Sequence, residues 1–181
     1  MSIDSGTYTL GPDTGELLVR TGRSGAAAKA GHDLVIEVGS WKATLEMATD
    51  PGRSRVELTA DGGSMIVREG KGGIQALGDD DKQGIRETID KEILKRTAIS
   101  FHSNAVAPST NADRLQVQGE LELLGRRAPI TFDLTLGQDG TLSAAAVVKQ
   151  TGWGIKPYSA LFGTLKVADE VEITFAGKLA D

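Results

Sequence analysis

Apolar and polar residues alternate with a period of two along much of this chain. The alternation is cleanest in five segments, at residues 41–47, 55–61, 115–123, 130–136 and 170–179. Successive side chains of a β-strand point to opposite faces of the sheet, so this period predicts strands with one buried face and one wet face. Weaker alternation predicts further strands at residues 17–21, 34–38, 64–67, 99–106 and 142–149.

Short turn signals separate these predicted strands. They are Asp50-Pro51-Gly52, Asp61-Gly62-Gly63, Lys71-Gly72-Gly73, Gly125-Arg126-Arg127 and Asp139-Gly140. Glycine, proline and aspartate favour tight turns, and spacers this short suit hairpins rather than parallel pairing. The chain therefore predicts a mainly antiparallel meander.

One segment, residues 79–96, has helical spacing instead. Ile85, Ile89 and Ile93 recur every four residues and form one apolar stripe. Three aspartates begin the segment and Lys95 and Arg96 end it, so each charge complements the helix dipole. We expect an amphipathic helix that lays its stripe over one open end of the sheet or along its edge.

About eight to ten strands must enclose a common interior, which fits either a closed barrel or a two-sheet sandwich. Closure removes exposed strand edges, and this favours the barrel. The length of 181 residues suits one domain. We therefore predict a mainly β fold, a single extended antiparallel lipocalin-like barrel domain over residues 1–181 with one amphipathic helix.

Composition narrows the function. The chain carries 20 Lys and Arg against 25 Asp and Glu, a net charge of -5, which disfavours a nucleic-acid partner. It contains no cysteine, which excludes disulfides and thiolate chemistry. No apolar run approaches the roughly 20 residues that span a bilayer, and the first residues do not resemble a secretory signal. We expect a cytoplasmic protein that does not span a membrane.

Catalytic and metal-binding motifs are not apparent. The two histidines, His32 and His102, lie far apart in sequence, which excludes a His-rich metal site and leaves only a mixed site with carboxylates. No Gly-x-Ser-x-Gly elbow occurs, and residues 22–29 lack the Gly-Lys-Ser/Thr ending of a phosphate loop. We predict no enzymatic activity, no metal and no cofactor beyond a bound isoprenoid or other lipid. An enzyme that uses pocket carboxylates is a minor alternative.

Several large apolar residues gather in one glycine-rich stretch, residues 151–167. Two interpretations stay open. The stretch folds back to plug the barrel, or it forms the mouth or lid of a pocket in which Tyr158 offers a polar group to a ligand head group. Lys156 and Arg126 could attract an acidic head group.

An ordered set of motifs covers nearly the whole chain. The set consists of Tyr8-Thr9-Leu10, the helix running into Ile99-Ser100-Phe101, residues 119–123 followed by residues 125–130, Trp153-Gly154-Ile155, and Ala168-Asp169-Glu170-Val171. In this order the motifs resemble the YceI-like family of polyisoprenoid-binding and lipid-binding barrel proteins. The resemblance implies an antiparallel barrel with a long apolar tunnel that takes an isoprenoid or similar chain.

These observations predict non-covalent binding of a long apolar or amphiphilic ligand, such as an isoprenoid, quinone or fatty-acid derivative, for carriage, storage or sequestration. The predicted interior residues are Trp41, Leu45, Leu58, Ile99, Phe101, Leu121, Phe132, Leu134, Ile173 and Phe175. The predicted mouth residues are Trp153, Ile155, Tyr158 and Phe162. The alternative is a barrel that is filled by its own side chains and binds protein, for example as a homodimer. This alternative stays open because a hollow and a filled barrel show the same alternation of apolar and polar residues.

Overall fold

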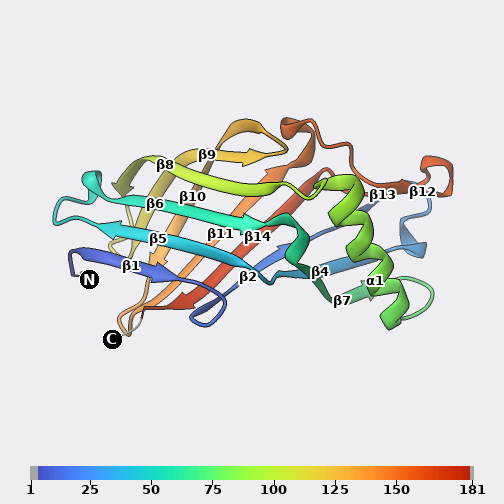
Figure 1. Cartoon of the computed structure of the whole chain (residues 1–181), viewed down its shortest axis with the longest axis horizontal. Helices are drawn as coiled ribbons and strands as arrows, with labels where there is room; N and C mark the ends of the chain where they lie inside the picture. Colours follow the sequence, from blue (N-terminus) through green and yellow to red (C-terminus); the bar gives the residue numbers. More distant parts are fainter. Residues whose placement is uncertain (1–3, 180–181) are drawn as a thin grey trace.

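A computed structural model describes residues 4–179 of the chain (Figure 1). Strands dominate it. They are β1 (Gly6–Leu10), β2 (Gly15–Arg20), β3 (Arg23–Ser24), β4 (His32–Val38), β5 (Trp41–Met47), β6 (Arg55–Asp61), β7 (Met65–Gly72), β8 (Ala98–Pro108), β9 (Arg114–Leu123), β10 (Arg126–Leu136), β11 (Thr141–Lys149), β12 (Ser159–Ala160), β13 (Leu165–Val167) and β14 (Glu170–Lys178). The helical elements are α1 (Asp79–Thr88), one π-helical turn η4 (Ile89–Ile93), and five short 3-10 turns, η1 (Ala28–Ala30), η2 (Pro51–Arg53), η3 (Gly62–Ser64), η5 (Gln150–Trp153) and η6 (Leu161–Gly163).

Eleven of these strands form one antiparallel sheet that curls around a common interior (Figure 1). Its order is β1-β5-β6-β8-β9-β10-β11-β14-β2-β4-β7. All ten predicted strands are present in it, and the predicted mainly β, antiparallel, barrel-like fold is confirmed. The wall is not a complete hydrogen-bonded ring, because β1 and β7 remain as sheet edges.

Two tight connections bring the ends of the sheet together. Between β4 and β5 the Gly39 amide donates to the carbonyl of Ser64 at 2.9 Å, and the Asp61 amide donates to the carbonyl of Ser40 at 3.0 Å. The chain therefore passes from the β4–β7 pair to the β5–β6 pair at one place. The β4–β7 pair forms one edge of the sheet, and the β5–β6 pair lies next to β1 at the other edge.

The helix is shorter than predicted. It is α-helical only from Asp79 to Thr88, after which η4 widens to a π turn in which the Leu94 amide donates to Ile89 at 2.8 Å. Lys95 and Arg96 then take left-handed conformations, with φ of 51° and 58°, so they end the helix instead of completing its last turn. The predicted amphipathic helix at about residues 79–96 is confirmed, and its helical structure ends three residues earlier, at Ile93, because the wide turn keeps Leu94 buried while the chain turns into β8.

The apolar stripe of this helical segment packs on the barrel core as expected. Ile85, Ile89 and Ile93 are half-buried against the core residues, and α1 lies beside β7 (Figure 1). The helix thus covers the opening beside the exposed edge of β7. No helix in residues 4–179 is long and apolar enough to cross a bilayer.

A small second sheet projects from the same end of the molecule as α1 (Figure 1). It consists of the hairpin β12–β13 paired with β3. Neither these short strands nor β1 were predicted. Strands of two or three residues carry too few positions for a period to show, and their pairing depends on tertiary contacts.

Candidate ligand cavity

The sheet and the helix enclose a cavity of about 810 Å³. This volume lies within the range of sites that hold drug-sized ligands, roughly 300 to 1,000 Å³. Most of the side chains that border it are aliphatic or aromatic. The large apolar residues among them are Leu10, Leu17, Val19, Leu34, Ile36, Val38, Leu45, Val56, Leu58, Met65, Leu77, Ile85, Ile89, Ile93, Leu94, Ile99, Phe101, Leu121, Leu123, Ile130, Phe132, Leu134, Leu142, Val148, Ile155, Tyr158, Leu165, Val167, Val171, Ile173 and Phe175.

Small inward side chains keep the interior open. Ala43 on β5, Ala60 on β6, and Ala144 and Ala146 on β11 all border the cavity, where larger residues would fill it. Inward-facing residues such as Phe132 are correspondingly only half-buried although they belong to the inner face. A packed interior would leave them fully buried, as protein cores are close-packed. The interior of this sheet is therefore hollow over much of its length.

Two aromatic contacts organise the walls. Phe101 and Phe132 pack with ring centroids 5.5 Å apart, across β9 from each other. Trp41 packs edge-on against Phe175 at 5.7 Å and 84°. Such tilted and edge-on pairs are favourable arrangements for aromatic rings.

One end of the barrel is closed by packed side chains. Val106, Leu115, Val117 and Leu136 lie beside the loops that connect β8 to β9 and β10 to β11, and all four are buried without bordering the cavity. Val117 is completely inaccessible. The cavity therefore does not extend to this end of the barrel.

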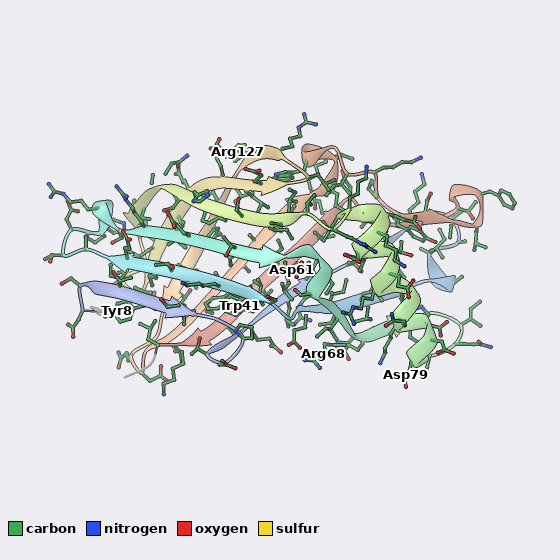
Figure 2. The ribbon with its side chains drawn as sticks, in the orientation of Figure 1. Tyr8, Trp41, Asp61, Arg68, Asp79 and Arg127 are labelled. Carbon is green, nitrogen blue, oxygen red and sulfur yellow. The ribbon has the colours of Figure 1, made fainter. Side chains whose placement is uncertain are left out.

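Polar side chains border the cavity at the other end, near α1 and the β12–β13 hairpin. They include Thr21, Arg23, His32, Asp80, Asp81, Tyr158 and Lys166. Figure 2 places Asp79, which begins α1, at the opposite end of the long axis from Tyr8. This polar rim marks the mouth of the cavity.

Arg23 is fixed at the mouth by its neighbours. Its Nε donates to Asp33 Oδ1 at 3.0 Å and its Nη1 donates to the carbonyl of Gly31 at 2.8 Å. The Nε2 atom of His32 lies 2.6 Å from the carbonyl of Gln75, in the loop before α1. Both side chains thus tie the strand β4 to the loops around the mouth.

The stretch that begins with η5 folds back onto the barrel. The Trp153 indole is buried and donates to the carbonyl of Leu121 at 2.7 Å, and Gln150 is buried and donates to Ala168 at 3.0 Å. Asp169 accepts from the Thr151 hydroxyl at 2.6 Å and from its amide at 2.8 Å. These hydrogen bonds hold the pKa of the Asp169 carboxyl below its usual value.

Most of the predicted interior residues border the cavity. Nine of the ten do so, namely Leu45, Leu58, Ile99, Phe101, Leu121, Phe132, Leu134, Ile173 and Phe175. The exception is Trp41, which is buried against Phe175 and reaches no part of the cavity surface. Strand alternation predicts which face a residue takes, but Trp41 sits at the start of β5, where the neighbouring ring covers it. Whether these side chains contact a ligand stays a prediction.

The predicted mouth residues divide into three groups. Ile155 and Tyr158 border the cavity, Trp153 is buried outside it, and Phe162 points away at the tip of the hairpin. The two interpretations of residues 151–167 therefore apply to different parts of the stretch. Trp153 is buried against the barrel wall through its hydrogen bond to Leu121, and Tyr158 borders the cavity at its mouth.

The cationic residues at the mouth are not the ones that the sequence suggested. Neither Lys156 nor Arg126 borders the cavity, whereas Arg23 and Lys166 do. Arg23 lies on the two-residue strand β3 and Lys166 on the three-residue strand β13, and strands this short show no period from which an inward side chain could be inferred. The cavity-facing Ile85 and Ile93 carried a clear signal in the helical stripe.

Residues 4–179 contain no group of three or more histidine or acidic side chains arranged to hold a metal ion. His102 is exposed on β8, with its Nδ1 3.7 Å from Glu57 Oε1 on β6, and does not border the cavity.

A curled antiparallel sheet around one apolar cavity, packed at one end and polar at the other, is the architecture of barrels of lipocalin type. Residues 21–179 match the model of the YceI-like domain. The chain therefore belongs to the YceI-like family, as the order of its sequence motifs indicated.

Solved structures show the same fold. The structure of Burkholderia cenocepacia BcnA is similar with a TM-score of 0.66 at 16% identity, over 92% of this chain and 96% of that chain. A Campylobacter jejuni YceI protein is similar with a TM-score of 0.56 at 10% identity, over 81% of this chain and 84% of that chain. A mutant of that protein was crystallised with a monobromobimane guest. Comparison with the curated proteins gave no match.

Proposed function

We propose that this protein binds one long-chain apolar or amphiphilic molecule, of the isoprenoid, quinone or fatty-acyl type, inside the barrel. The observation that carries the proposal is the 810 Å³ cavity with an almost entirely apolar wall and a polar rim at one end only. A ligand that matches it has a long apolar body and one polar end. Carriage, storage and sequestration are the roles that such binding serves.

The driving force is the transfer of methylene groups from water to the cavity. Each buried CH2 contributes about 0.8 kcal/mol before the costs of ordering the ligand are subtracted. The wall offers few hydrogen bonds, so it distinguishes ligands by length and width rather than by functional groups. Selectivity for a polar group belongs to the mouth.

Tyr158 and Arg23 are the side chains best placed to contact a head group. Tyr158 is half-exposed and borders the cavity, and the guanidinium of Arg23 is held in place by Asp33. A pre-positioned donor binds an acceptor group with less loss of side-chain entropy. Tyr158→Phe removes one hydrogen bond and should weaken binding of an amphiphile by about 0.5 to 1.5 kcal/mol.

The proposal is tested by filling the cavity from the inside. Ala144 borders the cavity at the middle of β11, where it pairs with Leu134 on one side and Phe175 on the other. Ala144→Trp places an indole in the empty space and should weaken binding of farnesol, a short-chain quinone and palmitate at least about tenfold. Binding is measured with the delipidated protein by fluorescence or calorimetry.

The matched control is Ser143→Trp. Ser143 precedes Ala144 on β11 and is exposed on the outer face, so the same side chain is added without entering the cavity. This variant should bind like the wild type. Equal binding by both variants, or no binding of any probe by the wild type at tens of micromolar, overturns the proposal and leaves a protein-interaction module as the explanation.

The cytoplasmic location, the absence of enzymatic activity and the association of two copies stay predictions. The binding function is independent of each of them. The part of the chain within residues 4–179 supplies the cavity without a second copy.

A further inference from the structure

The mouth of the cavity carries an apolar surface that the barrel does not cover. At the tip of the β12–β13 hairpin, Phe162 is fully exposed, with a relative exposure of 109%, and Leu161 is 55% exposed. Ordinary surfaces contain scattered apolar residues, but two adjacent large ones at a projecting tip are a stronger signal of an interaction site.

The backbone presents these side chains in a defined way. Leu161 and Phe162 take left-handed conformations, with φ of 50° and 55°, which bulky residues rarely adopt. The Thr164 hydroxyl and amide both donate to the Leu161 carbonyl, at 2.6 and 3.1 Å. The hairpin thus holds Phe162 outward although the conformation is unfavourable, and the barrel gains no packing from it.

The hairpin is also attached to the rim of the cavity. Its Leu165 borders the cavity, and the Ala27 amide donates to the Thr164 carbonyl at 2.9 Å. A Cβ on Gly25 would lie only 2.3 Å from that carbonyl, so the loop that contains η1 approaches the hairpin closely. The exposed tip therefore lies directly beside the mouth.

The charge around the tip is positive, although the whole chain carries -5. Lys166 follows the tip, Lys156 precedes it, and Lys29 lies on η1, which packs against β13. None of these three lysines forms an ion pair with another residue in the range 4–179. No Asp or Glu occurs within residues 21–32 or 140–168, the two segments that build this corner.

We propose that this corner, consisting of Leu161 and Phe162 with Lys29, Lys156 and Lys166, docks the mouth of the barrel onto a lipid surface that carries anionic head groups. An exposed aromatic residue flanked by lysines matches the two layers of such a surface, since the ring enters the acyl boundary and the ammonium groups meet the phosphates. The inference rests on the proposed ligand binding and adds the place where the ligand is exchanged.

The orientation of the docked protein follows from the position of the acidic residues. Asp79, Asp80 and Asp81 form the first turn of α1, and this end of the helix lies at the lower right of the view, away from the β12–β13 hairpin at the upper right (Figures 1 and 2). These carboxylates are repelled by an anionic surface. The protein therefore docks by the hairpin corner, tilted so that the N-terminal end of α1 faces away from the lipid.

Vesicle co-sedimentation tests the proposal. The full chain is mixed with vesicles of phosphatidylcholine alone or of phosphatidylcholine with phosphatidylglycerol, at low and at high salt. We expect binding to the anionic vesicles that Phe162→Ser weakens at least about tenfold and that high salt also weakens. The control Val147→Ser removes an apolar side chain that is 61% exposed on the outer face of β11 and should leave vesicle binding unchanged.

A parallel measurement separates this inference from the proposed function. Wild-type affinity for farnesol is measured without vesicles. Farnesol binding without vesicle binding overturns the docking proposal and leaves the cavity function intact. Vesicle binding without binding of farnesol, the quinone or palmitate overturns the cavity function, and with it the exchange of ligand at this corner. Self-association that Phe162→Ser abolishes, with no vesicle binding, shows that the corner contacts a second copy and also overturns the proposal.

Discussion

The two ends of the barrel are built from the same kinds of strand but differ in what fills them. At the closed end, Val106, Leu115, Val117 and Leu136 are buried and border no part of the cavity. At the open end, the inward positions border empty space, and polar side chains such as Arg23 form a rim. The packing of the closed end therefore stabilises the fold, while the open end has less packing and contains the cavity.

The largest expected effect separates the two ends by stability. Leu136 is buried at the closed end, whereas Leu165 is half-buried at the mouth. Leu136→Ala should lower the free energy of unfolding by about 2 to 5 kcal/mol, because the neighbours cannot collapse into the new void. Leu165→Ala should cost less than half as much, since solvent-accessible space already borders this side chain. Urea denaturation measures both losses of unfolding free energy, provided that this free energy depends on urea concentration with the same slope in the variants and the wild type. Equal losses would show that the two ends are packed alike.

A charge on the helical stripe should have the next largest effect. Ile89 is half-buried where η4 covers the barrel and borders the cavity. Ile89→Asp places an unpaired carboxylate against an apolar wall and should destabilise the fold by about 2 to 4 kcal/mol. The matched control Lys91→Asp changes an exposed position of the same turn. It removes a surface ion pair with Glu87 at 2.8 Å, and because such pairs contribute little, this variant should stay within about 1 kcal/mol of the wild type. An unchanged melting temperature for Ile89→Asp would mean that the helix does not pack on the barrel.

A smaller loss of stability is expected when the hydrogen bond that attaches residues 150–155 to the barrel is removed. Trp153→Phe keeps an aromatic ring but removes the hydrogen bond from the indole to Leu121. The loss should be about 1 to 2 kcal/mol, because a buried carbonyl loses a donor. Palmitate should raise the melting temperature of Trp153→Phe less than that of Leu165→Ala. The reason is that the hydrogen bond of Trp153 holds the cavity wall near Ile155 in place. Thermal unfolding with and without palmitate gives the comparison.

The smallest effect concerns pH. Because the pKa of Asp169 is below its ordinary value of 3.8, the ionised carboxylate stabilises the folded state. This contribution is fully present above the ordinary value and is lost as the pH falls through the lower pKa of the folded state. Asp169→Asn should therefore reduce stability at neutral pH, and the difference from the wild type should shrink as the pH falls below about 4. A difference that is constant from neutral to acidic pH would contradict this attribution.

Sequence patterns predicted the walls of the barrel more completely than its interior. Alternation placed β5 and β6 at their observed bounds, and the inward face of β10 includes Phe132 and Leu134 as predicted. A period of two depends only on which face is apolar, and both a hollow and a filled barrel satisfy it. The hollow interior depends on which side chains lie opposite Ala144 and Ala146, and the alternation within one strand does not predict this.

The parts that escaped prediction depend on contacts between distant segments. The π turn at η4 keeps Leu94 buried at the start of the path into β8, and a helical period cannot show such a change of pitch. Similarly, β3 pairs with β13, more than 140 positions later in the chain, as Arg23 opposite Val167. Arg23 reaches the mouth only through this pairing and its bond to Asp33. Local patterns carry no information about either.

The most direct test of the central claim is a chain-length series. Straight-chain alcohols of increasing length are titrated into the delipidated wild type and the affinity of each is measured. If the apolar cavity takes an extended chain, the affinity rises with each added methylene, by up to about fourfold per CH2, until the cavity is full. An affinity that does not depend on chain length, or no binding at tens of micromolar for any member, would contradict the claim that this barrel holds an apolar chain.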